Sequence, residues 1–76
     1  MITLSLPDKL AEKTYFFPEY SYGANKVTLI LESGRKVPNV FLAGGRDIVK
    51  IGSHKVSSAH DLDFQISDIV DVISEI

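Results

Sequence analysis

The sequence predicts a mainly β protein, a small bent antiparallel β-barrel of five or six short strands with one short N-terminal helix. The first observation is a series of short apolar runs rich in valine and isoleucine, β-branched residues that favour strands. The second is that the dipeptides Ser33-Gly34, Gly44-Gly45 and Gly52-Ser53 separate these runs as hairpin turns do. The third is Pro38-Asn39, which indicates either a bulge, where a small sheet can bend, or an edge position. A chain of 76 residues is expected to form a single domain, residues 1–76.

The first strand is expected near the N-terminus, where apolar and polar residues alternate from Ile2 to Leu6. Pro7 ends this run and can open a helix that extends through about Lys13. So short a helix is marginal on its own and needs tertiary packing to persist. The segment from residue 20 to residue 26 is expected to be a loop, because glycine and asparagine interrupt it.

Three further strands are expected to form a meander. The run from Val27 to Leu31 is nearly all apolar, which indicates a strand buried on both faces or at the centre of a barrel wall. The second arm extends from Val37 to Leu42, and its alternation slips at the proline. The third arm extends from Ile48 to Ile51, and Val56 beyond it lies in a short fourth strand or in a loop.

The C-terminal segment is compatible with two structures. Apolar and polar residues alternate from residue 62 to residue 66, which indicates a strand. Ser67 can then cap a helix with apolar residues on one side, or a single turn at Ser67-Asp68 can lead into a last strand from Ile69 to about Ile73. Five of the last eight residues are isoleucine or valine, whose stiff side chains favour the strand.

The predicted core is mostly aliphatic and comes from the inward positions of these elements. Phe16 and Phe17 are expected to plug one end of the barrel. The other predicted core residues are Leu4, Leu6, Leu10, Val27, Leu29, Leu31, Val40, Leu42, Val49, Ile51, Phe64, Ile69 and Val72.

The segment VTLILESGRKVPNVFLAGGRDIVKI, residues 27–51, resembles the first half of an Sm-like or other SH3-like small barrel. The family pattern has an apolar strand, a turn with glycine and a basic residue, a bent strand, and a third strand led by an acidic residue. Gly34-Arg35 and Asp47 stand in the matching places. The segment FQISDIVDV resembles the short turn and final strand of such barrels, so the resemblance implies a barrel fold.

The resemblance does not extend to the RNA contacts of Sm-like proteins. Asn39 stands where the bent strand of that family usually has glycine. Ile48 and Val49 follow Asp47 where the family has an RNA-contacting asparagine. The resemblance therefore implies a shape and no RNA-binding residues, and a fold alone does not imply a function.

Composition narrows the classes of function. The net charge of −2 and the pI of about 5.5 argue against a generic polyanion binder. The absence of cysteine excludes disulfides, cysteine-zinc sites and thiol nucleophiles. The longest aliphatic run is Leu29 to Leu31, and no basic region precedes an apolar stretch at the N-terminus. We therefore expect a cytoplasmic protein that has no membrane span, no membrane partner and no secretory signal.

Candidates for catalysis or metal binding are few. His54 and His60, with nearby aspartates, could ligate a divalent ion, but their spacing matches no compact ligand motif. A nucleophilic set of Ser57 or Ser58 with His60 and Asp61 joins close sequence neighbours, which rarely reach the geometry of a triad. The sequence therefore predicts a protein that is not an enzyme, with no cofactor, no metal site and both histidines at the surface. The acidic C-terminal third is expected to be a solvated face: Asp61, Asp63, Asp68, Asp71 and Glu75.

The most unusual feature is the segment TYFFPEYSY, which places five of the seven aromatic residues between positions 15 and 22. Tyr15, Tyr20 and Tyr22 form a contact surface or lie across the outside of the barrel, and tyrosine is enriched in interfaces. A domain of this size gains stability by burying apolar surface in a partner. The preferred function is a small non-catalytic interaction module that self-associates or binds a protein partner.

The alternative function is that of a small-barrel RNA- or DNA-binding protein. The residues for it lie in the hairpin region, apart from the acidic C-terminal third: Arg35, Lys36, Arg46 and Lys50. These basic groups can meet phosphates while tyrosines stack on bases. The two functions differ in their response to salt, because counterion release makes nucleic-acid binding weaken steeply as salt rises.

Overall fold

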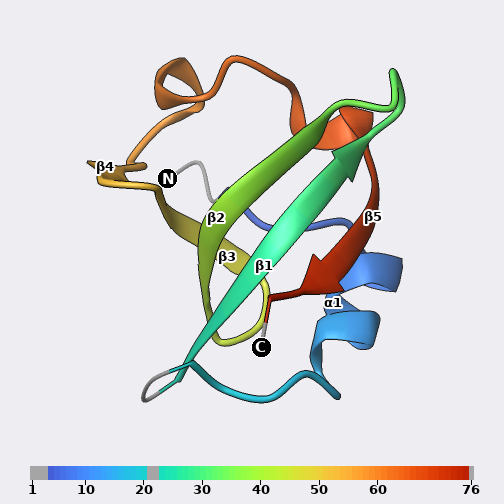
Figure 1. Ribbon diagram of the computed structural model, residues 1–76. Coiled ribbons are helices and arrows are strands. Elements are labelled where there is room, and N and C mark those ends of the chain that lie inside the picture. The colour runs from blue at the N-terminus through green and yellow to red at the C-terminus, as the bar shows by residue number, and fades with distance from the viewer. Residues whose placement is uncertain (1–3, 21–22, 76) are drawn as a thin grey trace.

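The computed structural model describes residues 4–20 and 23–75, which form a five-stranded antiparallel sheet with one short helix beside it (Figure 1). The strand order is β4-β3-β2-β1-β5, so β4 and β5 are the outer strands and the sheet is open between them in the described residues. The prediction of a mainly β chain with a short N-terminal helix is confirmed. The elements are α1 (Asp8–Thr14), β1 (Ala24–Leu31), β2 (Lys36–Ala43), β3 (Asp47–Ile51), β4 (His54–Lys55), η1 (Ala59–Asp61), η2 (Ile66–Asp68) and β5 (Ile69–Ser74), where η is a 3-10 helix.

The chain before α1 lies along the edge of β3. The Ile48 N–H donates to the Leu4 carbonyl at 2.9 Å, and the Leu6 N–H donates to the Arg46 carbonyl at 2.8 Å. The predicted strand at residues 2–6 is therefore reduced to one bridge, between Ser5 and Asp47, and residues 2 and 3 lie outside the described residues. Residues 4–6 and β4 together occupy the outer edge of β3.

The predicted bulge in β2 is confirmed. Val27 of β1 faces Val40 and Leu29 faces Val37, so one residue of β1 is opposite both Pro38 and Asn39. Asn39 has a φ of 59°, a left-handed conformation that asparagine tolerates better than most residues. A bulge of this kind bends its strand and increases its twist, which curves the sheet around the core.

A second bulge, in β3, changes which residues of that strand point inward. Leu42 faces Ile48 and Phe41 faces Lys50, so Val49 is the extra residue. The extra residue reverses the alternation, which buries Ile48 at 3% exposure and leaves Val49 at 42%. The prediction that Val49 belongs to the core is therefore wrong.

The C-terminal segment takes the second of its two expected forms, a turn followed by a strand. The turn is η2, and β5 then pairs with β1. A third bulge leaves Val70 opposite no residue of β1, and Val70 is exposed. The strand predicted over residues 62–66 is absent: residues 62–65 form irregular structure between η1 and η2, and Ile66 begins η2.

The core lies on one face of the sheet, and alternate residues of β1 enter it. Leu10, Ile51 and Phe64 are only partly buried at its margin. Val37 and Val56 are buried although they were not predicted in it. The predicted core residues that are confirmed as buried are Leu4, Leu6, Val27, Leu29, Leu31, Val40, Leu42, Ile69 and Val72.

The buried Thr14 joins α1 to the turn after β2, and a second buried polar residue, Asn25, joins the start of β1 to the segment that follows α1. The Thr14 hydroxyl lies between the carbonyls of Ala11 and Gly45, and the Asn25 amide donates to the Pro18 carbonyl at 3.0 Å. Gly45 has a φ of 75°, and a Cβ there would lie 3.3 Å from the Thr14 hydroxyl. The positive φ, together with the close approach of helix and turn, therefore favours glycine at this position.

Candidate interaction surfaces

The first candidate surface lies at the end of α1. The Tyr15 N–H donates to the Ala11 carbonyl at 3.2 Å, and the Phe16 N–H donates to the Lys13 carbonyl at 3.3 Å. Both residues therefore extend the last turn of α1. They are 82% and 83% exposed. Phe17 turns inward and packs against the core while remaining partly buried. The prediction that Phe16 plugs one end of a barrel is therefore wrong, because the helix turns its side chain to the surface.

The two exposed rings stand beside a groove. Tyr15 and Phe16 meet edge to face, with ring centroids 5.4 Å apart. The groove separates α1 from the turn after β2 and contains an ion pair between Arg46 and Asp8, at 2.7 Å. Its lining is formed by Asp8, Ala11, Glu12, Tyr15, Phe16, Gly44 and Arg46. A protruding aromatic pair next to a groove is a shape suited to contact with another protein.

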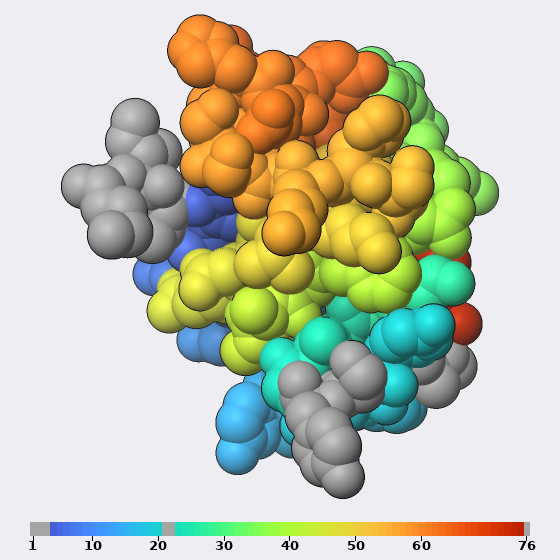
Figure 2. Space-filling model, turned by 90° about the vertical axis from the view of Figure 1, so that its left-hand side faces the viewer, coloured from blue at the N-terminus to red at the C-terminus, as the bar shows by residue number. Residues whose placement is uncertain are grey.

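The second candidate surface crosses four strands. Lys26 of β1 faces Phe41 of β2, Phe41 faces Lys50 of β3, and Lys50 faces Lys55 of β4. Facing residues of antiparallel neighbours project from the same side of a sheet, so the four side chains lie in one line. Figure 2 faces this side of the molecule, with β4 and β3 in orange and yellow above β2 and the start of β1. We call this line the basic-aromatic row: Lys26, Phe41, Lys50 and Lys55.

Tyr20 packs against the row. Its ring centroid lies 5.5 Å from that of Phe41, at an interplanar angle of 70°. The Lys26 Nζ is 5.5 Å from the centroid of Tyr20 and 5.9 Å from that of Phe41, and the Lys50 Nζ is 5.2 Å from that of Phe41. These distances are in the range of cation–π contacts. The aromatic pair is therefore flanked by ammonium groups from β1 and β3.

The charges of the row have no ionic partner in the described part of the chain, where the three salt bridges use Lys13, Arg35 and Arg46. Lys50 and Lys55 face each other directly, an arrangement that is unfavourable for like charges. Glu75 borders the row. Its carboxylate accepts hydrogen bonds from the Asn39 N–H at 2.6 Å and from the Thr28 hydroxyl at 3.0 Å, so its charge is already engaged there.

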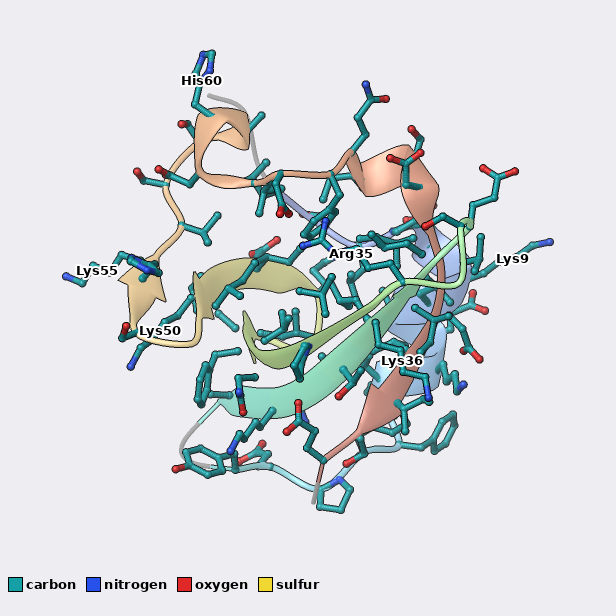
Figure 3. The ribbon with its side chains drawn as sticks, turned by 45° about the horizontal axis from the view of Figure 1, so that its top comes forward. Lys9, Arg35, Lys36, Lys50, Lys55 and His60 are labelled. Carbon is teal, nitrogen blue, oxygen red and sulfur yellow. The ribbon has the colours of Figure 1, made fainter. Side chains whose placement is uncertain are left out.

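The structure does not bring the predicted basic residues together. Arg35 donates to Asp63 at 2.7 Å, and Arg46 is engaged by Asp8. Lys36 lies well away from Lys50, which projects with Lys55 from the β3–β4 hairpin (Figure 3). Lys26 and Phe41 are the residues that the sequence analysis missed. Their signal is their facing position in the β1–β2 hairpin, which becomes visible only when the register is counted from the Ser33-Gly34 turn and corrected for the bulge at Pro38-Asn39.

The predicted tyrosines also separate. Tyr15 stands at the end of α1, Tyr20 lies on the basic-aromatic row, and Tyr22 lies outside the described residues. The expected aromatic contact surface therefore divides between two places in the structure.

Asp61 binds the backbone of the segment just before it in the chain. Its carboxylate accepts hydrogen bonds from the Ser57 N–H at 2.9 Å, the Ser58 N–H at 3.2 Å and the Ser57 hydroxyl at 3.2 Å. These hydrogen bonds, chiefly those from the backbone, lower the pKa of Asp61. The serine here contacts the aspartate rather than His60, which differs from the order of groups in a nucleophilic triad.

Two other carboxylates pair with distant basic residues. A hydrogen bond from Arg35 lowers the pKa of Asp63, and a hydrogen bond from Lys13, at 2.5 Å, lowers the pKa of Asp71. The acidic C-terminal third is solvated, as expected, but its carboxylates also bind other parts of the chain.

No protein-family model, curated protein or solved structure matches the chain. Among residues 4–20 and 23–75, no helix is long and apolar enough to cross a membrane. In the same residues, no group of three or more histidine and acidic side chains is placed to hold a metal ion.

Proposed function

We propose that this protein is a small non-catalytic interaction module that docks a protein partner, in the simplest case a second copy of itself, through Tyr15 and Phe16. The single observation that carries this proposal is their exposure of 82% and 83%. Fully burying an aromatic side chain of this size contributes about 1.5–3 kcal/mol. A two-fold axis between two copies would bury both aromatic pairs at once, because such an interface uses the same patch on each subunit.

The groove beside the pair supports the same assignment. Its lining includes the small residues Ala11 and Gly44 and the Asp8–Arg46 ion pair. An aromatic side chain from the partner can enter beside Tyr15 while its polar edge meets this ion pair. We retain Tyr15 from the sequence-based site and add Phe16, whereas Tyr20 belongs to the other surface.

The experiment is a measurement of mass by sedimentation over a range of protein concentrations. The wild-type protein should shift from monomer to dimer as concentration rises, and the Tyr15→Ser/Phe16→Ser variant should stay monomeric with an unchanged melting temperature. Val70→Ser is the matched control, because it also removes an exposed apolar side chain, from β5. A wild-type protein that stays monomeric throughout would overturn self-association. A control that loses the dimer as the double variant does would place the interface elsewhere.

For the fold we propose a small barrel of the SH3-like or Sm-like type. Its support is the antiparallel order of five short strands, the three bulges that bend them, and the 3-10 turn η2 immediately before β5. A closed barrel predicts slow amide exchange on the outer edges of both β4 and β5, because each edge would have a hydrogen-bonding partner. Rapid exchange on both edges would instead identify an open sheet.

A further inference from the structure

We propose that the basic-aromatic row, together with Tyr20, binds single-stranded nucleic acid. This site is separate from the Tyr15–Phe16 surface, and the proposal does not depend on self-association. Its starting point is the register, which aligns Lys26, Phe41, Lys50 and Lys55 across four strands. Neighbouring strands lie about 4.8 Å apart, so the row extends across roughly 14 Å of surface. That length accommodates about four nucleotides stacked at ~3.4 Å each.

The charge of the row calls for an anionic ligand. Three ammonium groups lie together without an ionic partner in the described residues, in a protein whose ten acidic residues outnumber its eight basic ones. Two of them, Lys50 and Lys55, face each other across the β3–β4 pair. Bound phosphates would remove this repulsion, because each would sit between positive charges.

The aromatic rings select nucleic acid among the anions. Phe41 lies between the two lysines of β1 and β3, and Tyr20 is half exposed beside it. A base can stack on an aromatic ring while the phosphates on either side meet the flanking lysines, which is how non-sequence-specific single-strand binders work. An acidic peptide has charge but no planar base for these rings. In a duplex the bases are already stacked on one another and cannot reach them.

The lysines that lie elsewhere supply a matched control. Lys9 and Lys36 are also exposed and also lack an ion pair in the described residues, but they project far from Lys50 and Lys55 (Figure 3). The variants Lys50→Gln/Lys55→Gln and Lys9→Gln/Lys36→Gln therefore change the net charge equally. Any difference between them reports the position of the charge rather than its amount.

The experiment measures the binding of a labelled oligothymidylate of about 12 nucleotides by fluorescence anisotropy at several salt concentrations. Three phosphate contacts predict a slope of log K against log salt of about −2, since each contact contributes about −0.7 for single strands. Lys50→Gln/Lys55→Gln should reduce the slope to about −0.7, and Lys9→Gln/Lys36→Gln should leave it near −2. Absence of binding at low salt, or equal effects of the two variants, would overturn the proposal.

Stacking is tested at Phe41. Phe41→Leu keeps an apolar side chain of similar size and should lower affinity about 5- to 150-fold, whereas Phe41→Trp should retain or increase it. Melting curves of both variants establish that they are folded. Wild-type affinity in the folded Phe41→Leu variant would overturn the stacking role. Equal affinity for polyglutamate would identify the row as a site for acidic polypeptides, and equal affinity for duplex DNA would identify it as a duplex site; either result contradicts the proposal.

Discussion

The acidic C-terminal third and the basic-aromatic row place their charges in opposite settings. Each carboxylate of the C-terminal third accepts a hydrogen bond from another group of the chain, either a backbone N–H or a distant side chain. In the row, Lys26 and Lys50 lie over aromatic rings, Lys55 faces Lys50 across the β3–β4 pair, and none of the three has an ion-pair partner in the described residues. The comparison separates charges that hold the fold together from charges that are available to a ligand. The carboxylates are Asp61, Asp63, Asp68, Asp71 and Glu75.

The largest effect is expected from the core beneath both regions. Leu42 is fully buried next to Phe41 of the row. Leu42→Ala should lower the free energy of unfolding by about 2–5 kcal/mol, because it removes buried methyl groups and leaves a cavity. Urea unfolding measures this change. Ile73→Ser, at an exposed position, should change stability by less than about 0.5 kcal/mol and serves as the control. Similar effects of the two substitutions would contradict the assignment of the core.

The next effect is a dependence of stability on pH that comes from the acidic region alone. Asp61, Asp63 and Asp71 have pKa values below the ordinary 3.8 in the folded protein. Their contribution is therefore complete above the unfolded value and is lost as pH falls through the lower folded values, where the unfolded chain binds more protons. The midpoint of urea unfolding should accordingly fall as the pH is lowered from about 6 to about 2.

The control for this prediction removes the three carboxylates. Asp61→Asn/Asp63→Asn/Asp71→Asn should be less stable than the wild type at neutral pH and should show a weaker dependence on acid pH. An unchanged pH profile in the triple variant would show that other carboxylates stabilise the folded state against acid.

The smallest effect is expected from two lysines, whose replacement should change the free energy of unfolding in opposite directions. Lys13→Gln removes the partner of Asp71 and should lower the free energy of unfolding by a few tenths of a kcal/mol, since this pair is nearly half exposed. Lys55→Gln removes a charge that faces Lys50 and should raise the free energy of unfolding by about as much. The two variants have the same net charge, so a difference in their urea unfolding reports only the location of the lysine that was removed. A loss of stability in both would mean that Lys55 also has a structural role.

The sequence predicted the parts of the fold that carry local signals. Proline indicates the bulge at Pro38-Asn39, and glycines indicate the hairpin turns. The bulges at Val49 and Val70 carry no such residue, since valine suits either a paired or a bulged position. For this reason the sequence predicts Val49 in the core, whereas the structure buries Ile48.

The candidate surfaces were less predictable because each depends on a geometric detail. Phe16 and Phe17 are neighbours of similar hydrophobicity, and only the residue at which α1 ends decides which of them is exposed. The row depends on the pairing register of three hairpins, which brings together Lys26 and Lys50 from 24 positions apart. The pairing register cannot be predicted from composition and residue spacing alone.

Residues 4–6 have a consequence for how the molecule behaves in a crowded solution. A long edge strand with free backbone groups is a template on which strands of other chains can add, and such addition leads to aggregation. Here one stretch of the β3 edge is covered by the bridge at Ser5, and another by the two residues of β4. Both covering pieces are too short to offer a continuous template themselves. The edge of β3 is thus covered by short fragments, so residues that contribute little to the sheet reduce the length of β3 on which another chain could add.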